Sequence, residues 1–253
     1  MPRAARIAAW SLAGLILLVL ILVAAVVVIG NTAAGRRLLE SETAKLTSGR
    51  VRIAGLGGKF PSDIELASLQ MSDPKGVWMS ARGISVHWSP FALLAWDMHV
   101  ESLSIQSAEV LRRPLSSPSA AKRSSSRSSS SSLPAIHIDR MQIGTLVLEP
   151  AAAGLAANLN VHGDLHYRSA KNARGSLVAR RTNGTGDYEV TFGIARSSLS
   201  ARLRLEEPAG GPLEHLLNVP DLGALSVAAS LDGPRNAERL ALDAHAGQLS
   251  ANA

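Results

Sequence analysis

Beyond residue 50, most of the chain alternates between apolar and polar residues with a period of two. A period of two places the apolar side chains on one face of a β-strand. Turn sequences such as Asn183-Gly184 separate the runs. The cleanest runs are residues 188–194, 199–206, 225–231 and 240–246. The pattern predicts a mainly β protein built from strands that are each apolar on one face.

The first runs are less regular, because the alternation slips by one residue within them. Ile64 and Leu66 share one phase, whereas Leu69 and Met71 follow the other. The same slip separates three apolar pairs later in the chain, namely Ile136/Ile138, Met141/Ile143 and Leu146/Leu148. Such slips indicate bulges or bends in the strands.

Few helices are expected. Residues 32–47 have a helical pattern, and this helix either lies on a membrane surface or caps the start of a sheet, which we favour. Short helical turns are predicted after Ser89-Pro90 and from Pro212 to Leu217. Since no helix of 10–15 residues alternates with the strands, an α/β fold is excluded. We expect an elongated, curled antiparallel-type sheet, although the spacing alone also fits a sandwich or barrel.

The N-terminal region is of a different kind. Residues 7–29 are 23 consecutive uncharged, mostly apolar residues, which span roughly 34 Å as a helix. This length crosses a bilayer and predicts a single-pass transmembrane helix. The alternative is a signal peptide cleaved near Ala33-Ala34, but the apolar part of a signal peptide has only ~7–15 residues. Basic residues flank the span almost equally, so their count does not decide the orientation. Because a first helix with a short basic N-terminus generally leaves that end in the cytoplasm, we place the N-terminus there.

Residues 116–132 form a low-complexity segment in which eleven of seventeen residues are serine. Such a segment cannot bury a core and is typical of a flexible linker. We therefore divide the chain into four parts. These are an anchor (1–30), a first β-rich segment (31–115), a Ser-rich linker (116–133) and a second β-rich segment (134–253).

Composition and charge narrow the functional classes. The net charge is +6, but the basic residues are scattered, so they suit an anionic membrane better than nucleic acid. Aromatic residues make up only 4 % of the chain, which predicts an aliphatic core. The absence of cysteine excludes disulfides, thiol nucleophiles and cysteine-ligated metals.

No catalytic constellation is evident. His162 and His166 would be ~13 Å apart on a strand, too far to share a metal ion. Gly55–Gly58 has no following Lys-Ser/Thr, and therefore is not a phosphate loop. Glu206 and Glu207 are adjacent and would face opposite sides of a strand. We predict that the protein is not an enzyme and uses no cofactor or metal.

Several segments together resemble the N-terminal part of the TamB family. They are LTSGRVRIAGLGGKFP (46–61), DPKGVW (73–78), HWSPFALL (87–94) and EEPAGG (206–211), following a single N-terminal anchor. TamB is the inner-membrane component of the translocation and assembly module, within the wider AsmA-like group. Family members are longer, and this chain ends in mid-pattern, so we expect it to be a fragment or a truncated relative.

The resemblance implies a bacterial inner-membrane protein with its bulk in the periplasm and a TamA-like partner in the outer membrane. Two roles follow from it: phospholipid transport between the membranes, or a scaffold for inserting outer-membrane and autotransporter proteins. Strands that are apolar on one face fit a groove for acyl chains and ordinary packing of two sheets equally well. The resemblance favours the groove. The residues expected to line the groove are Tyr188, Val190, Phe192, Ile194, Leu199, Leu203, Leu205, Leu225, Val227, Leu240 and Leu242.

Overall fold

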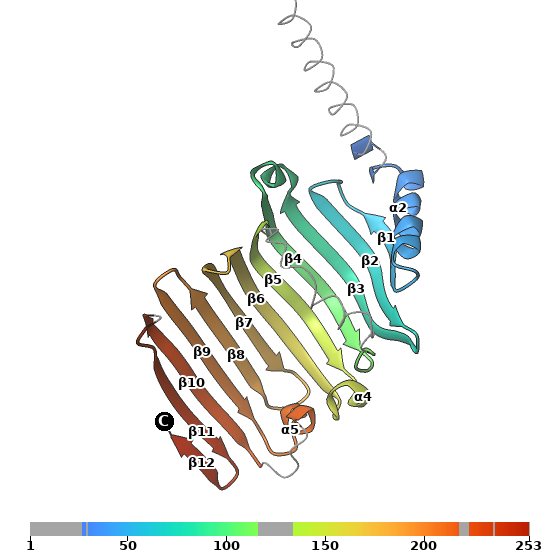
Figure 1. The fold of residues 1–253 in the computed structure, drawn as a ribbon. Coiled ribbons are helices and arrows are strands. Elements are labelled where there is room, and N and C mark those ends of the chain that lie inside the picture. Colours follow the sequence, from blue (N-terminus) through green and yellow to red (C-terminus); the bar gives the residue numbers. More distant parts are fainter. Residues whose placement is uncertain (1–26, 29, 116–133, 218–222, 235, 253) are drawn as a thin grey trace, which may run out of the picture.

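The computed structural model describes residues 27–28, 30–115, 134–217, 223–234 and 236–252. These residues form one open sheet of twelve strands, which lie side by side in chain order (Figure 1). The strands are β1 (Val51–Gly57), β2 (Asp63–Asp73), β3 (Gly76–Ser89), β4 (Asp97–Val110), β5 (Ala135–Leu148), β6 (Ala157–Ser169), β7 (Asn172–Arg181), β8 (Asp187–Ile194), β9 (Ser198–Glu207), β10 (Leu225–Pro234), β11 (Arg239–Ala246) and β12 (Leu249–Asn252). The predicted mainly β fold is confirmed.

Neighbouring strands are antiparallel except at one place in the middle of the sheet. β4 and β5 are parallel, with Asp97 beside Ala135 and Val110 beside Leu148. The antiparallel prediction is therefore wrong for this pair, because the chain returns to the starting end of β4 before β5 begins. The pair joins the two predicted β-rich segments into one sheet. The predicted linker, residues 116–133, lies outside the described residues.

The helices are short, as expected. They are α2 (Ala33–Leu46), the 3-10 helix η1 (Pro90–Ala95), α4 (Pro150–Ala153) and α5 (Pro212–Leu217). α2 begins after Thr32, whose hydroxyl accepts a hydrogen bond from the Gly35 amide. It lies against the edge strand β1, where the Glu40 carboxylate accepts the Leu56 amide at 2.8 Å. This confirms that the helix caps the start of the sheet.

The predicted anchor, residues 7–29, lies outside the described residues apart from Val27 and Val28. Within the described part of the chain, no helix is long and apolar enough to cross a membrane.

Two of the predicted phase slips, Leu66/Leu69 in β2 and Ile143/Leu146 in β5, line up across neighbouring strands. The third, Ile138/Met141, lies nearer the start of β5. The register places five residues in one row from β1 to β5, at the position where each strand changes phase. We call this row the kink line, and its members are Gly55, Ala67, Gly83, Gln106 and Gly144. On either side of the row the apolar partners match, as in Leu66–Ile84 and Leu69–Ala81. The aligned slips therefore keep all apolar side chains on the same face.

Glycine is required at two positions of the kink line. Gly55 and Gly83 have φ values of +69° and +60°, a region that side chains with a Cβ rarely adopt. A Cβ atom at Gly55 would lie 2.4 Å from the Cβ atom of Ala67. At Gly83 it would lie 2.7 Å from the side-chain oxygen of Gln106. The turn in the backbone and the close approach of the next strand both exclude larger residues.

The buried cluster of this region flanks the kink line. Ile84 is 7 % exposed, and Ala81 and Ala108 are 2 % exposed. The partly buried side chains packed against them all come from the same sheet: Leu66, Leu69, Val86, Leu103, Ile105, Ile143 and Leu146. This cluster is thus formed by side chains of β2 to β5 packing on one another on one face. Further buried apolar residues lie in β6 and β7, namely Ala157, Leu159, Val161 and Ala173.

Candidate functional site

All eleven residues predicted to line a groove lie on one face of the sheet. In an antiparallel pair, residues opposite each other point to the same side. The register contains the pairs Tyr188–Leu205, Val190–Leu203, Phe192–Ala201, Ile194–Leu199, Val227–Leu205, Leu225–Ala246, Ala229–Leu242 and Leu231–Leu240. No register shift interrupts the pairings from β7 to β12. The regular alternation therefore produces one continuous apolar surface.

This surface is open over β8 to β12. Leu203 is 36 % exposed, Val190 39 % and Leu240 62 %. The other predicted residues are half-buried, and none of the apolar side chains described in these strands is fully buried. Sequence reasoning missed two further exposed members, Leu177 of β7, which faces Val190, and Leu249 of β12, which faces Ala246. The same alternation extends through both strands and could have identified them.

A buried carboxylate closes the surface at one end of β9. Glu207 is 5 % exposed and lies opposite Leu225, on the apolar face. Its Oε1 accepts the Tyr188 hydroxyl at 2.7 Å, and its Oε2 accepts the Leu213 amide at 3.0 Å. Burial and this hydrogen bond raise the pKa of the Tyr188 phenol well above its ordinary value. Tyr188 thus lines the surface with its ring while its hydroxyl is held by Glu207.

The opposite orientation of the two adjacent glutamates is confirmed. Glu206 lies opposite Ser226 and is exposed on the polar face, where its Oε1 is 2.8 Å from a guanidinium nitrogen of Arg204. The two carboxylates therefore occupy different surfaces and cannot act together as an acid and a base.

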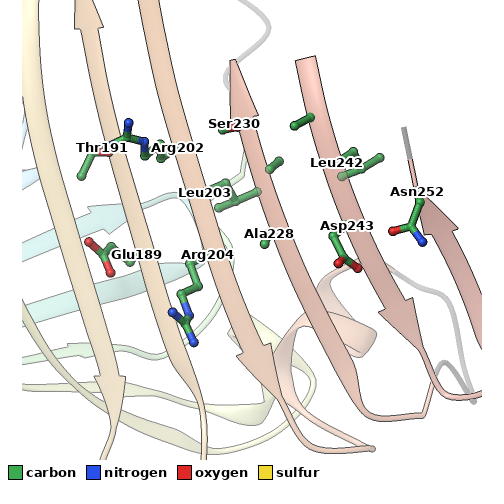
Figure 2. Close-up of a pocket in the computed structure, with 12 residues that line it drawn as sticks. Glu189, Thr191, Arg202, Leu203, Arg204, Ala228, Ser230, Leu242, Asp243 and Asn252 are labelled. Carbon is green, nitrogen blue, oxygen red and sulfur yellow. The ribbon is translucent and has the colours of Figure 1, made fainter. Parts of the chain in front are cut away.

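The polar face carries an open pocket of about 810 Å³ over β8 to β12 (Figure 2). Small residues of β10 and β11, including Ala228, Ser230 and Ala241, form part of its lining. The arginines beside it already have carboxylate neighbours: Arg204 pairs with Glu206, and Arg202 is 4.0 Å from Asp232. Both arginines in the lining therefore lie beside carboxylates. Most of the lining belongs to the polar face, but Leu203 and Leu242, which were predicted to line the groove, are also part of it.

A row of histidines on the polar face was not visible in the sequence. His99, His137 and His166 lie side by side on β4, β5 and β6, with ring centroids 6.1 and 5.5 Å apart. A 2.8 Å hydrogen bond between His99 and Asp139 raises the pKa of the histidine and lowers that of the carboxyl. Over the described ranges, no group of three or more His, Asp or Glu side chains is arranged to hold a metal ion.

No protein-family model, curated protein or solved structure matches the chain. The resemblance to the TamB family therefore stays a prediction, and the function is argued from the geometry of the sheet.

Proposed function

We propose that this chain is a membrane-anchored carrier surface for phospholipids, acting in outer-membrane biogenesis as the resemblance to the TamB family implies. The observation that carries the proposal is the open apolar surface of β7 to β12. A soluble sheet normally covers an apolar face with a second layer. Here Leu203 and Leu240 remain exposed within a continuous row of apolar side chains. A surface of this kind suits an apolar ligand.

We infer that the sheet curls around its apolar face. Positive φ values turn the backbone at Gly55 and Gly83, and five phase changes are aligned in the kink line across β1 to β5. Ile84 is 7 % exposed and belongs to a cluster whose packed side chains all come from its own sheet, which supports a concave face there. The groove is filled by its own side chains at this kinked half, and opens toward β7 to β12.

The open half is wide enough to hold an acyl chain. Six strands at ~4.8 Å spacing span about 24 Å from β7 to β12. One leaflet of a ~30 Å hydrocarbon core accommodates acyl chains of roughly 15 Å. Burying apolar area stabilises a complex by ~25 cal/mol per Å². The protein would bind acyl chains passively, with headgroups in water, and without a catalytic residue or cofactor.

The rest of the proposal concerns location and partners. Residues 7–29 would anchor the chain in the inner membrane with the N-terminus in the cytoplasm. The sheet would then lie in the periplasm and lead toward a TamA-like protein of the outer membrane. The uninterrupted alternation up to β12 supports an elongated surface.

Site-specific photocrosslinking of the full chain tests the lipid surface. Leu242 and Asp243 are adjacent on β11 and point to opposite faces. A photoreactive residue at Leu242 should crosslink phospholipid in cells, whereas one at Asp243 should not, and native mass spectrometry of the purified chain should show bound phospholipid. Equal crosslinking from both positions, or no lipid from either, would contradict the proposal.

A second candidate function, a scaffold for client strands, is favoured by the outer edge of β12. All four residues of this strand are exposed, and among the described strands it pairs with β11 alone. An open edge can accept a further strand through backbone hydrogen bonds. A crosslinker at Ser250 would then trap an unfolded outer-membrane protein. Trapping of lipid alone would reject this function.

A further inference from the structure

The loop between β3 and β4 carries several large apolar side chains that are strongly exposed. Leu94 is 89 % exposed, Phe91 81 % and Trp96 63 %, and Leu93 and Met98 add to them. Residues 88–96 contain no charged side chain. We call residues 90–96 the apolar loop. A contiguous apolar patch of this kind marks a site of interaction with a membrane or a protein.

Hydrogen bonds connect this loop, through residues 60–62, with Asn31, which follows the predicted anchor. Asn31 donates to the carbonyl of Phe60 at 2.7 Å and accepts its amide at 3.1 Å. Two residues further along the same loop, the Ser62 carbonyl accepts the amide of Trp88 at 2.9 Å. Trp88 lies two residues before the start of η1. Residue 31 and the apolar loop therefore lie at the same end of the sheet (Figure 1).

The charges at this end suit a membrane surface that contains anionic lipids. Arg37 and Lys59 are exposed there. The nearby carboxylates of Asp63, Asp97 and Asp139 each lie against a histidine, namely His87, His137 and His99. The Glu101 carboxylate accepts a hydrogen bond from the Ser89 hydroxyl. Basic side chains near a bilayer are attracted to anionic headgroups, and tryptophan is enriched at the boundary between headgroups and acyl chains.

We propose that the apolar loop inserts into the interfacial layer of the bilayer in which residues 7–29 are anchored. The inference rests on the membrane anchor of the proposed function. The loop would form a second attachment beside the first and hold this end of the sheet against the membrane. Phospholipid would then have direct access to the apolar face, which begins at this end with Val86 and Val100.

The absence of cysteine makes a direct test possible in the full chain. Single variants Leu94→Cys, Leu46→Cys and Leu20→Cys are labelled with the fluorophore NBD and reconstituted in vesicles of phosphatidylethanolamine with phosphatidylglycerol. Leu46 is the matched control, because it is 84 % exposed and lies at the far end of α2, roughly 21 Å from the start of the helix. Leu20 lies within the predicted anchor and reports on it separately.

Each label is probed with doxyl-labelled lipid and with aqueous iodide. We expect the label at position 94 to be quenched several-fold more by doxyl lipid than the label at position 46, and to be shielded from iodide. Exposure of position 94 to iodide, with position 20 quenched by lipid, would overturn the loop insertion and leave the anchor intact. Shielding of position 94 from both quenchers would show a protein contact and would also overturn it. If position 20 is not quenched by lipid, the anchor of the proposed function fails, whereas quenching at position 94 would still support the loop.

Discussion

The two halves of the sheet use the same alternation of residues and arrive at different surfaces. In β1 to β5 the alternation changes phase at the kink line, and the apolar side chains beside that line are buried, as at Ile84. In β8 to β12 the alternation is unbroken, and the apolar side chains stay exposed or half-buried, as at Leu203. The apolar content of the strands therefore does not decide whether the face is closed.

We infer that the geometry of the backbone decides whether the apolar face is closed. Gly55 and Gly83 allow the positive φ values that turn the strands at the kink line. Side chains on the two sides of the line, such as Ile84 and Leu69, can then pack in one cluster. From β8 to β12 no aligned row of this kind occurs and the register is not shifted, and the apolar side chains there stay exposed or half-buried. Four predictions test this contrast, ordered by the expected loss of folding stability.

The largest loss is expected in the buried cluster. Ile84→Ala should lower the free energy of unfolding by about 2–5 kcal/mol, because it removes buried methyl groups and leaves a cavity. Leu203→Ala in the open half is the matched control and should cost much less, since Leu203 is 36 % exposed. Urea unfolding of the full chain in mild detergent measures both. Similar losses from the two variants would show that the halves are equally closed.

A smaller loss is expected from the kink line itself. Gly83→Ala should destabilise by about 1–3 kcal/mol, because alanine is strained at φ +60° and its Cβ would meet Gln106. Gly193→Ala in β8 is the control, since its φ is not positive and its Cβ would meet only the mobile hydroxyl of Ser200. The control should change stability by less than about 1 kcal/mol. If Gly83→Ala is equally mild in the same unfolding assay, the kink line does not depend on glycine.

Much of this contrast could be predicted from local sequence. That Tyr188 and Val190, and likewise Leu203 and Leu205, lie on the apolar face follows from the period of two. The helical turn from Pro212 follows from the glycines and proline at its start. The slips at Leu66/Leu69 and Ile143/Leu146 were also visible. The short helix after Ser89-Pro90 was found, but the exposure of its side chains was not, because nothing local shows which elements will cover a loop.

Features that depend on pairing between distant strands could not be predicted. The kink line aligns Gly55 with Gly144, which are 89 positions apart, and its existence depends on the register of four strand pairs. The row of His99, His137 and His166 has the same origin. The histidine row also depends on the parallel pairing of β4 and β5. The sequence between these two strands has no pattern that predicts parallel pairing.

The third prediction compares an ion pair from each half. In the kinked half, Arg112 makes two hydrogen bonds to Asp73, of 2.6 and 2.7 Å, and only 9 % of the aspartate side chain is exposed. In the open half, Arg202 and Asp232 are 4.0 Å apart and mostly exposed. Asp73→Asn should therefore lower the unfolding midpoint at neutral pH, whereas Asp232→Asn should leave it unchanged.

The effect of Asp73 should depend on pH in a defined direction. The Arg112 hydrogen bonds, followed by the Leu115 amide, hold the pKa of the Asp73 carboxyl far below its ordinary value. A carboxyl with a lowered folded pKa stabilises fully above its unfolded pKa of ~3.9 and loses this contribution as the pH falls below it. The midpoints of the native chain and Asp73→Asn should converge below about pH 4. A constant difference down to pH 2 would contradict this origin.

The smallest effect on stability, and the largest on ligand binding, is expected at Leu203. Leu203→Arg would place a charge on the open apolar surface, where bound acyl chains cannot solvate it. Because Leu203 is 36 % exposed, the arginine head can reach water when no lipid is bound, and the fold should survive. Arg202→Glu is the control at the adjacent position on the polar face. Native mass spectrometry should show phospholipid lost from Leu203→Arg and retained by Arg202→Glu, with similar melting temperatures for both. Unfolding of Leu203→Arg would instead identify this half as a closed core like the first. Equal loss of lipid from the two variants, with both folded, would show that the faces are assigned wrongly.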